Sequence, residues 1–265
     1  MNNKPTIEKL WEIAEKYKPT GKPIMTGIKD FDSDMDGGIR GGELITISGI
    51  SGHGKTLYAL WITKQLHDSG VPTLWFTYEM NPWYLKEKFI QMGCKEDLNT
   101  YVPIEHSNNT DKWIEERILE GYMKYAIKVI FIDHLHYLLP PEQEMNISLL
   151  IGGVVRKLKQ LAVKQDVTIY LIAHMRKLQI GEKVDVNAVR DSALIINESD
   201  YVYLIERLKK KKKALDDEPG IEMQNISRIT LAKNRRTGNI RYKLFEVKNL
   251  NFWEVNSQNY KNYEN

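Results

Sequence analysis

The sequence predicts an α/β fold with a mostly parallel central sheet flanked by helices. Three observations lead to this expectation. Apolar, β-branched runs of strand length alternate along the chain with segments whose apolar residues have helical spacing. A glycine-rich loop joins the first of these strands to a helix. Polar residues end several of the strands, at the edge where doubly wound sheets bind their ligands.

Length and composition fit one large domain. The chain has 265 residues, 42% hydrophobic and 28% charged, which excludes a disordered or fibrous protein. Thirty-eight basic residues against 35 acidic ones leave a net charge of +3, which neither requires nor excludes nucleic acid. The single cysteine, Cys94, excludes an intrachain disulfide and fits a reducing compartment. With no apolar run near membrane-spanning length and no signal-peptide pattern, we expect a cytoplasmic protein without a membrane partner.

A phosphate-binding motif lies between the predicted strand at 43–48 and the predicted helix at 56–66. The intervening residues fit G-x-x-x-x-G-K-[ST] at every fixed position: Gly49-Ile50-Ser51-Gly52-His53-Gly54-Lys55-Thr56. Glycines let successive N–H groups point at anionic oxygens, Lys55 reaches the β- and γ-phosphates, and Thr56 binds Mg²⁺. The alternative is a chance glycine turn before a helix, which the complete motif and its flanks disfavour. We therefore predict a nucleotide ligand.

Two segments precede this motif. Residues 5–18 have the apolar spacing of a short amphipathic helix, followed by a linker. Periodicity alone does not decide whether this helix packs on its own domain or on a neighbouring subunit. Residues 26–42 are expected to form a turn-rich lead-in to the first strand.

A carboxylate follows the next predicted strand, at 73–78. Glu79 at this position would face the ligand crevice of an α/β sheet. Alternatively it is a surface residue capping the next helix, at 83–92, which Asn81-Pro82 is expected to start. The pattern then predicts a short strand at 100–106 and a helix at 111–125.

The strand at 128–133 ends in Asp133, the Walker B pattern, in which the aspartate arranges the Mg²⁺ shell with Thr56. This Walker B match is specific only because of its distance along the chain from the phosphate-binding loop. His134 and His136 follow directly. A zinc site is disfavoured because no Cys or His cluster in the sequence completes one.

A third polar residue, His174, ends the strand at 167–173, which follows a helix at 147–164. We expect His174 to lie level with Glu79 and Asp133, although a lone histidine is more often structural. The loop after it is basic and contains Arg176, Lys177, Lys183 and Arg190.

The C-terminal part predicts a strand at 200–205 and a β-hairpin from strands at 228–232 and 240–247. The five lysines at 209–213 favour a solvated loop, with phosphate binding as the lesser alternative. The hairpin tip is expected to expose basic side chains suited to a neighbour's phosphate: Lys233, Arg235 and Arg236.

Together these motifs resemble the RecA-type motor core of the DnaB-like hexameric replicative helicases, and are most similar to the branch of phage primase-helicases and the mitochondrial replicative helicase. The segments that carry the resemblance are Asp133-His134, Lys157-Leu158-Lys159, Ala173-His174-Met175-Arg176-Lys177, Val189-Arg190-Asp191-Ser192-Ala193-Leu194, Leu204-Ile205-Glu206-Arg207 and Lys233-Asn234-Arg235-Arg236-Thr237-Gly238. The implied division is a linker helix at 1–21, a RecA-like motor domain at 22–254 with a C-terminal hairpin, and a polar tail at 255–265.

The resemblance implies a role for each site residue. ATP, or another NTP or dNTP, would be held by Gly49, Ser51, Gly52, His53, Gly54, Lys55 and Thr56, with Mg²⁺ at Thr56 and Asp133. Glu79 would polarise the attacking water and His174 would sense the γ-phosphate. Lys233 and Arg235 would enter the neighbouring subunit's site, Arg235 as the arginine finger, and Arg207 would stack on the adenine. The DNA backbone would be contacted by Arg176, Lys177, Lys183 and Arg190.

The implied activity is an ATP-dependent, ring-forming replicative helicase that moves 5'–3' on single-stranded DNA and unwinds duplex. Its partners would be single-stranded DNA, further copies of itself in a hexamer or similar ring, and a primase, loader or polymerase. No primase or N-terminal dimerisation domain precedes the linker, so we expect a minimal helicase or an excised motor domain. One alternative is a RecA- or KaiC-like ATPase that binds DNA without unwinding it. A non-catalytic scaffold is disfavoured by the intact Lys55, Thr56, Glu79 and Asp133.

Overall fold

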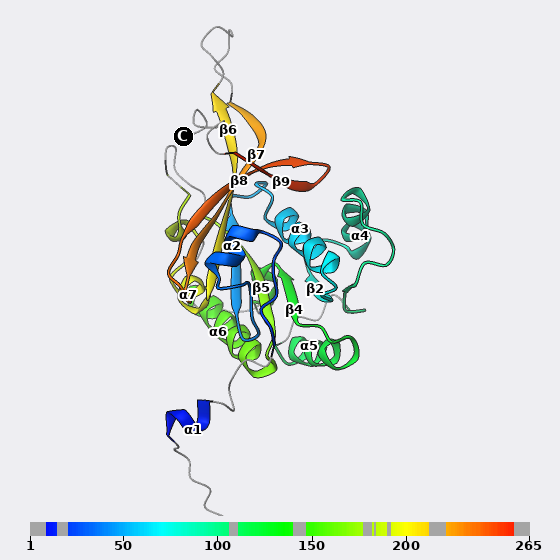
Figure 1. Ribbon diagram of the computed structural model, residues 1–265, viewed down its shortest axis with the longest axis vertical. Helices are drawn as coiled ribbons and strands as arrows, with labels where there is room; N and C mark the ends of the chain where they lie inside the picture. Colours follow the sequence, from blue (N-terminus) through cyan, green and yellow to red (C-terminus); the bar gives the residue numbers. More distant parts are fainter. Residues whose placement is uncertain are drawn as a thin grey trace, which may run out of the picture.

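The computed structural model is built around one nine-stranded sheet with the strand order β3-β2-β4-β5-β1-β6-β7-β8-β9 (Figure 1). The structure describes residues 9–14, 21–105, 111–139, 147–176, 182, 184–189, 192–211 and 221–256. The strands are β1 (Leu44–Gly49), β2 (Thr73–Thr77), β3 (Thr100–Tyr101), β4 (Val129–Asp133), β5 (Thr168–His174), β6 (Tyr201–Lys211), β7 (Ile221–Asn234), β8 (Arg241–Lys248) and β9 (Asn251–Val255).

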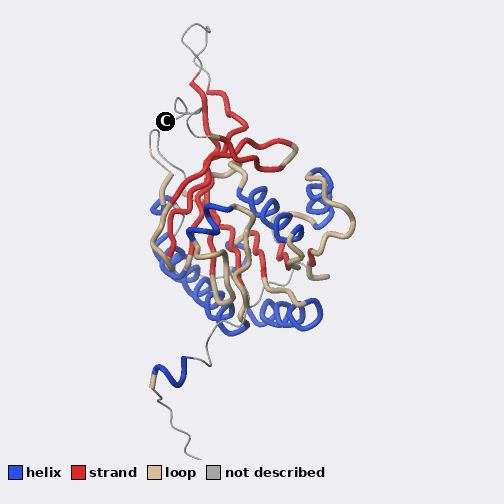
Figure 2. The backbone as a smooth tube through the Cα atoms, in the orientation of Figure 1, coloured by secondary structure: helices blue, strands red, loops and turns tan. Residues whose placement is uncertain are grey.

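The helices lie on both faces of this sheet, as Figure 2 shows. They are α1 (Leu10–Ala14), α2 (Lys29–Asp34), α3 (Lys55–Asp68), α4 (Pro82–Gln91), α5 (Asp111–Tyr125), α6 (Ile147–Gln165) and α7 (Ser192–Glu198), with short 3₁₀ turns at Leu135–Leu138 and Val186–Ala188. Among the described residues, none of the helices is long and apolar enough to cross a lipid bilayer.

Alternation along the buried strands produces two cores. In β4, Val129 and Phe131 belong to the core under α2, α3 and α4, whereas Ile130 and Ile132 belong to the core under α5, α6 and α7. Successive side chains of a strand point to opposite faces, so a strand covered on both faces must be apolar throughout. This requirement explains the continuous apolar runs of the sequence.

The first core contains a column of stacked rings across three neighbouring strands. Trp75 of β2 stacks on Phe131 of β4 with ring centroids 4.8 Å apart, and Phe131 stacks on Tyr170 of β5 at the same distance. The indole Nε1 of Trp75 donates to the Thr63 hydroxyl of α3 at 3.0 Å, so the buried N–H is satisfied. This column fixes α3, and with it the phosphate-binding loop, against the sheet.

Strand direction divides the sheet in two. The strands from β3 to β6 are parallel, and β7, β8 and β9 continue the sheet in antiparallel pairs. Along β1 and β6 the register pairs Ile45 with Tyr201 and Gly49 with Ile205. Tyr201 in turn pairs with Asn234 at the end of β7. The turn between β7 and β8 therefore lies at the end of the sheet where β1 and β6 begin, opposite the C-terminal end of β1.

The predicted α/β fold with a mostly parallel sheet and a C-terminal hairpin is confirmed, and three local expectations are corrected. The lead-in at 26–42 contains α2, whose Phe31 is fully buried. The first three residues of the lysine run extend β6 instead of forming a loop, and Lys209 pairs with Met223. β9 was not predicted. It pairs with β8, and its Phe252 packs on Trp61.

The N-terminal helix is present in the described part of the predicted segment, as α1. Its Leu10 and Trp11 are 67% and 83% exposed, so they do not pack on the chain's own sheet (Figure 1).

Replacing Trp75 by alanine is expected to destabilise the fold strongly. The change removes a fully buried ring, its stacking on Phe131 and its hydrogen bond to Thr63. Urea denaturation should show a loss of about 3–5 kcal/mol in the free energy of unfolding. Trp83, which is 60% exposed on α4, is the matched control, and its replacement by alanine should change stability by less than about 0.5 kcal/mol. Equal losses in the two variants would contradict the assignment of this core.

Candidate functional site

The phosphate-binding loop connects the end of β1 to the start of α3 and depends on two glycines in particular. Gly54 caps α3 with φ +94°, in the left-handed region that favours glycine. A Cβ on Gly49 would lie 2.3 Å from the carbonyl oxygen of Ile205, so only glycine lets β1 pass this close to β6. The turn and the close approach place the N-terminus of α3, with its free N–H groups, at the C-terminal edge of the sheet.

Lys55 and His53 fix the shape of this loop. The ammonium of Lys55 is buried and donates to the carbonyl oxygens of Gly49 and Ile50 at 3.1 and 3.2 Å. Burial lowers the pKa of Lys55, and the nearby Asp133 and Glu79 oppose that shift. His53, also buried, accepts at Nδ1 from the backbone N–H of Arg207 at 3.0 Å. His53 thus ties the loop to β6, a supporting contact that sequence reasoning did not assign to it.

Thr56 and Asp133 form an oxygen pair suited to a divalent cation. The Thr56 hydroxyl donates to Oδ2 of Asp133 at 2.8 Å. Asp133 is 1% exposed, and its Oδ1 has no hydrogen-bond partner among the described residues. Burial raises the pKa of Asp133 to about 6, an effect that Glu79 reinforces and the Thr56 hydrogen bond opposes. A buried carboxylate oxygen without a donor is stabilised by a bound cation, so these residues fit Mg²⁺.

Glu79 lies at the same edge, directly after β2. Its backbone N–H and that of Tyr78 donate to the carbonyl oxygen of Asp133 at 3.3 and 2.8 Å. Its carboxylate oxygen Oε2 is 3.1 Å from Nδ1 of His134, and its side chain is 49% exposed. The N-cap of α4 is Asn81, whose side chain accepts from the N–H of Trp83 at 2.9 Å. Glu79 therefore lies beside Asp133 and His134 at the C-terminal ends of the strands and does not cap the helix.

His174 completes a cluster at this edge. Its ring centroid is 4.4 Å from that of His134, and one ligand atom from each of Glu79, His134 and His174 lies within 4.8 Å of the others. Burial, assisted by Lys55, lowers the pKa of His174 to about 4. The imidazole is therefore neutral near pH 7. The sequence offers His134 as a disfavoured zinc ligand and as part of the Asp133-His134 segment of the family resemblance, without a role in the site. Its place directly after Asp133 is the signal that it belongs here.

Arg207 lies just beyond the loop, on β6. Its backbone donates to His53, and its guanidinium Nη2 donates to Oδ1 of Asn225 on β7 at 3.0 Å. The backbone of Arg207 is therefore tied to the phosphate-binding loop, and its side chain to β7.

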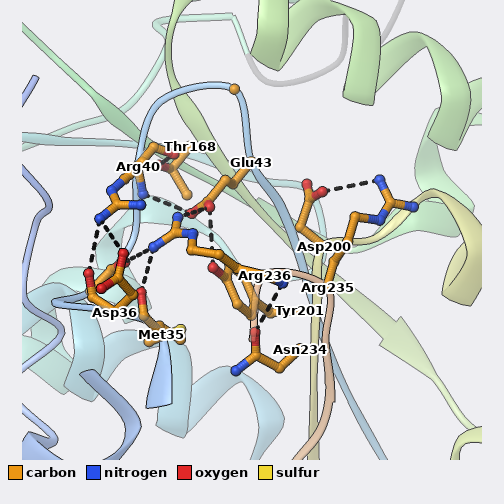
Figure 3. Close-up of polar contacts among 12 residues, drawn as sticks. Met35, Asp36, Arg40, Glu43, Thr168, Asp200, Tyr201, Asn234, Arg235 and Arg236 are labelled. Atoms are coloured by element: carbon orange, nitrogen blue, oxygen red, sulfur yellow. Dashed lines mark hydrogen bonds and ion pairs between the residues drawn. The ribbon is translucent and has the colours of Figure 1, made fainter. Parts of the chain in front are cut away.

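The basic residues of the β7–β8 turn contact their own chain, and Figure 3 shows Arg235 and Arg236. Arg235 is exposed as predicted, whereas Lys233 and Arg236 are partly buried, which corrects the expectation for these two. Lys233 donates to the carbonyl oxygen of Ile196 at 2.6 Å. Arg235 donates to Oδ1 of Asp200 at 3.1 Å and to the carbonyl oxygen of Asn197 at 2.5 Å, with its side chain still 49% exposed. Arg236 is partly buried and contacts the carbonyl oxygens of Met35 and Gly38 and the carboxylate of Glu43, so its role is structural.

Asp200 connects this turn to the first strand. Its Oδ2 accepts from the backbone N–H of Leu44 at 2.8 Å and from the ammonium of Lys159 at 2.6 Å, while Oδ1 accepts from Arg235. Asp200 is 7% exposed, so these bonds lie away from solvent. One carboxylate therefore joins β1, α6 and the hairpin.

Of the four predicted DNA-contacting residues, only Arg176 is within the described part of the chain. It is exposed, its backbone N–H donates to the carbonyl oxygen of Ala188 at 3.0 Å, and its guanidinium pairs with Glu182. The other three lie outside the described residues: Lys177, Lys183 and Arg190.

Fold and site together define a P-loop ATPase of the RecA type. A model of the family described as "ATPase: KaiC" matches residues 24–207, and the chain belongs to this family.

Two solved structures have the same fold. The first, solved as an ATPase domain, superposes with a TM-score of 0.75 at 16% identity, covering 93% of this chain and 96% of that domain. The second, a DnaB-like replicative helicase studied with its interactions with primase, also superposes with a TM-score of 0.75, at 18% identity, covering 95% of this chain and 69% of that one. The resemblance to the DnaB-like helicase core is thus confirmed at the level of the fold.

The pKa of His174 predicts a pH dependence of stability. An unfolded histidine titrates near pH 6.5, and in the folded chain the pKa is lowered to about 4. Between these values the unfolded state binds a proton that the folded state does not, so stability falls as the pH falls. His174→Gln removes this group and leaves His134 in both proteins, so the comparison reports the loss of the His174 titration together with its coupling to His134.

Between pH 7.5 and 5, we expect the wild type to lose about 1 kcal/mol more unfolding free energy than His174→Gln, after allowing for solvent screening of this partly exposed ring. Urea denaturation at the two pH values measures the difference. Equal losses of unfolding free energy in the two proteins would show that folding does not lower the pKa of His174.

Proposed function

We propose that this chain is an ATP-dependent DNA helicase that works as a ring and moves 5'–3' on single-stranded DNA. The observation that carries the proposal is the position of Arg235 relative to its own phosphate-binding loop. The register pairs Asn234 with Tyr201. Arg235 therefore lies level with Asp200, whose carbonyl oxygen accepts from the backbone N–H of Arg235. The phosphate-binding loop instead follows Gly49, which pairs with Ile205. At about 3.3 Å per residue, the strand between Tyr201 and Ile205 spans about 13 Å, to which the loop adds more. An arginine so placed serves a second copy of the chain better than its own.

The chemistry of the two edges is complementary. One edge offers a phosphate-binding loop, a cation site and Glu79 beside His134, which suits hydrolysis of a nucleoside triphosphate with Mg²⁺. The opposite edge offers a half-exposed guanidinium, Arg235, with Lys233 next to it. An arginine supplied in trans neutralises charge in the phosphoryl transition state and raises the rate by about 10³–10⁵-fold. Ring assembly would bring the two edges together.

In this mechanism each residue of the chain has a distinct task. The loop N–H groups and Lys55 would hold the triphosphate. Thr56 and Asp133 would hold Mg²⁺, which would supply positive charge to offset that of the phosphates. Glu79 orients the attacking water and accepts its proton, and the contact with His134 holds its carboxylate in place. Neutral His174 donates a hydrogen bond toward the γ-phosphate. Arg207 borders the nucleotide beyond the loop.

Single-stranded DNA is the proposed second ligand. β5 ends at His174, and Arg176 follows two residues later. A displacement of His174 at the γ-phosphate would therefore displace Arg176 as well. The positive side chains proposed for DNA contact, Arg176, Lys177, Lys183 and Arg190, suit the phosphate backbone and would bind without sequence preference. Primase is a proposed partner because of the similarity to a DnaB-like helicase that interacts with primase.

A second candidate function is a RecA- or KaiC-like ATPase that binds DNA without unwinding it. The match to the KaiC family over residues 24–207 favours this alternative. A forked duplex separates the two candidates. A helicase unwinds a fork that carries a 5' single-stranded tail in the presence of ATP, and it leaves a fork with only a 3' tail intact. ATPase activity stimulated by single-stranded DNA, with neither fork unwound, would select the alternative.

Mixing two inactive variants tests the arginine in trans. Arg235→Ala and Lys55→Ala should each lower DNA-stimulated ATP hydrolysis by at least about 10³-fold, since one lacks the finger and the other the phosphate contact. In mixed rings a site from the Arg235→Ala chain can receive Arg235 from a Lys55→Ala neighbour. Hydrolysis should therefore return to a measurable fraction of the wild-type rate on mixing.

The control for this experiment is Arg156→Ala, which removes a 63% exposed arginine that pairs with Glu198 on the surface. It should hydrolyse ATP at the wild-type rate. If mixing restores nothing while size measurements show that mixed rings form, Arg235 does not act in trans.

A further inference from the structure

We propose that Glu79, His134 and His174 form a binding site for a transition-metal cation of the zinc type, and that an occupied site blocks hydrolysis. Metal binding at this cluster does not depend on the proposed function. Only its effect on hydrolysis does, through the role proposed for Glu79.

The spacing of the three side chains carries the proposal. Zn²⁺ binds imidazole nitrogen and carboxylate oxygen at about 2.0–2.1 Å, so the ligand atoms of a tetrahedral site lie about 3.3 Å apart. Oε2 of Glu79 and Nδ1 of His134 are 3.1 Å apart, already close to this spacing. All three ligand atoms lie within 4.8 Å of one another. Because Glu79 and His134 are already at this spacing, the remaining gap is to His174, and side-chain rotation within the cluster must close it.

The ligand set distinguishes this site from the Mg²⁺ pair of Thr56 and Asp133. Two imidazoles and one carboxylate are a ligand set of zinc enzymes, which leave a fourth position open to water. Mg²⁺ prefers oxygen ligands in octahedral geometry, which the hydroxyl and the buried carboxylate supply. Two different cations are thus matched to neighbouring groups at one edge of the sheet.

Access and charge set the strength of the site. The side chains of His134 and Glu79 are 12% and 49% exposed, so a cation can reach them from solvent. Burial lowers the pKa of both histidines, and the Lys55 ammonium lowers it further, so the same positive charge also opposes a bound cation. Binding should be weaker than at a structural zinc site for this reason.

Occupation has a direct consequence for Glu79. A carboxylate bound to zinc no longer accepts a proton from water, whereas Lys55 and the loop N–H groups remain available to the triphosphate. The occupied enzyme is expected to bind ATP and not to hydrolyse it.

Cobalt(II) added to the full chain tests the site directly, because four-coordinate Co²⁺ gives an intense visible absorption that octahedral Co²⁺ lacks. The wild type should develop this band, and added Zn²⁺ should remove it by competition. His134→Gln and His174→Gln should each weaken Co²⁺ binding by at least about tenfold, which corresponds to the loss of one ligand. Circular dichroism checks that each variant is folded.

His67→Gln is the matched control. His67 lies twelve residues after Lys55 on α3, about 18 Å along the helix, and its substitution should leave the Co²⁺ band unchanged. A wild type without the band, or a band that survives both ligand substitutions, would overturn the metal site and leave the proposed function untouched.

Hydrolysis under saturating Mg²⁺ and ATP completes the test. Zn²⁺ should inhibit the wild type with a midpoint that follows its affinity in the Co²⁺ competition. Binding of Zn²⁺ without inhibition would overturn the role given to Glu79, while the metal site itself would stand.

Discussion

The parallel pairing of β1 with β5 and β6 is the constraint on which the candidate site depends. Its register places Gly49 beside both His174 and Ile205, so the phosphate-binding loop begins level with the end of β5. The pairing of β2 with β4 likewise sets Thr77 beside Asp133, and Glu79 follows two residues later. Because all these strands run in one direction, polar residues far apart in sequence meet at one edge. A slip by one residue would turn each of them to the other face.

Burial disfavours the charged form of the ionisable groups at this edge, whether the charge is positive or negative. It lowers the pKa of Lys55 and raises that of Asp133, so both groups are shifted toward their neutral forms. Phosphate oxygens would stabilise the charged lysine, and a divalent cation would stabilise the charged aspartate. Without ligands, the folded chain carries the free-energy cost of burying these two charged groups. Nucleotide and cation together would offset that cost, and the gain is part of the free energy of binding.

At the opposite edge, Asp200 connects several elements through its buried carboxylate. Its carboxylate receives hydrogen bonds from the first residue of β1, from Lys159 of α6 and from Arg235. Removing the carboxylate would leave the buried N–H of Leu44 without this acceptor and would leave Lys159 with only the carbonyl oxygen of Gly42, which is more costly than losing a surface ion pair. The same interaction that anchors the strand leading to the phosphate-binding loop also holds the arginine proposed to act on a neighbour.

Local pattern was sufficient to predict the strand, loop and helix of the phosphate-binding motif, the helix at 111–125 and the mostly parallel character of the sheet. Each depends on a short-range pattern, either apolar residues at helical spacing or an apolar run of strand length. The conformational preferences behind these patterns come from residues close together in the sequence. Within the site, the sequence indicated Lys55, Thr56, Glu79, Asp133 and His174 as separate strand-end or loop residues. It did not indicate that His134 would contact Glu79.

Only the tertiary structure decided what these residues touch. The cluster of Glu79, His134 and His174 joins three strand ends that are 55 and 40 positions apart, and its spacing follows from sheet order and register. The burial of Arg236 against Glu43 and the pairing of Lys209 with Met223 depend likewise on partners that no nearby residue specifies. Periodicity determined which face of each element is apolar. Long-range pairing determined which polar groups those faces bring together, because strand order and register are set by the packing of the whole sheet.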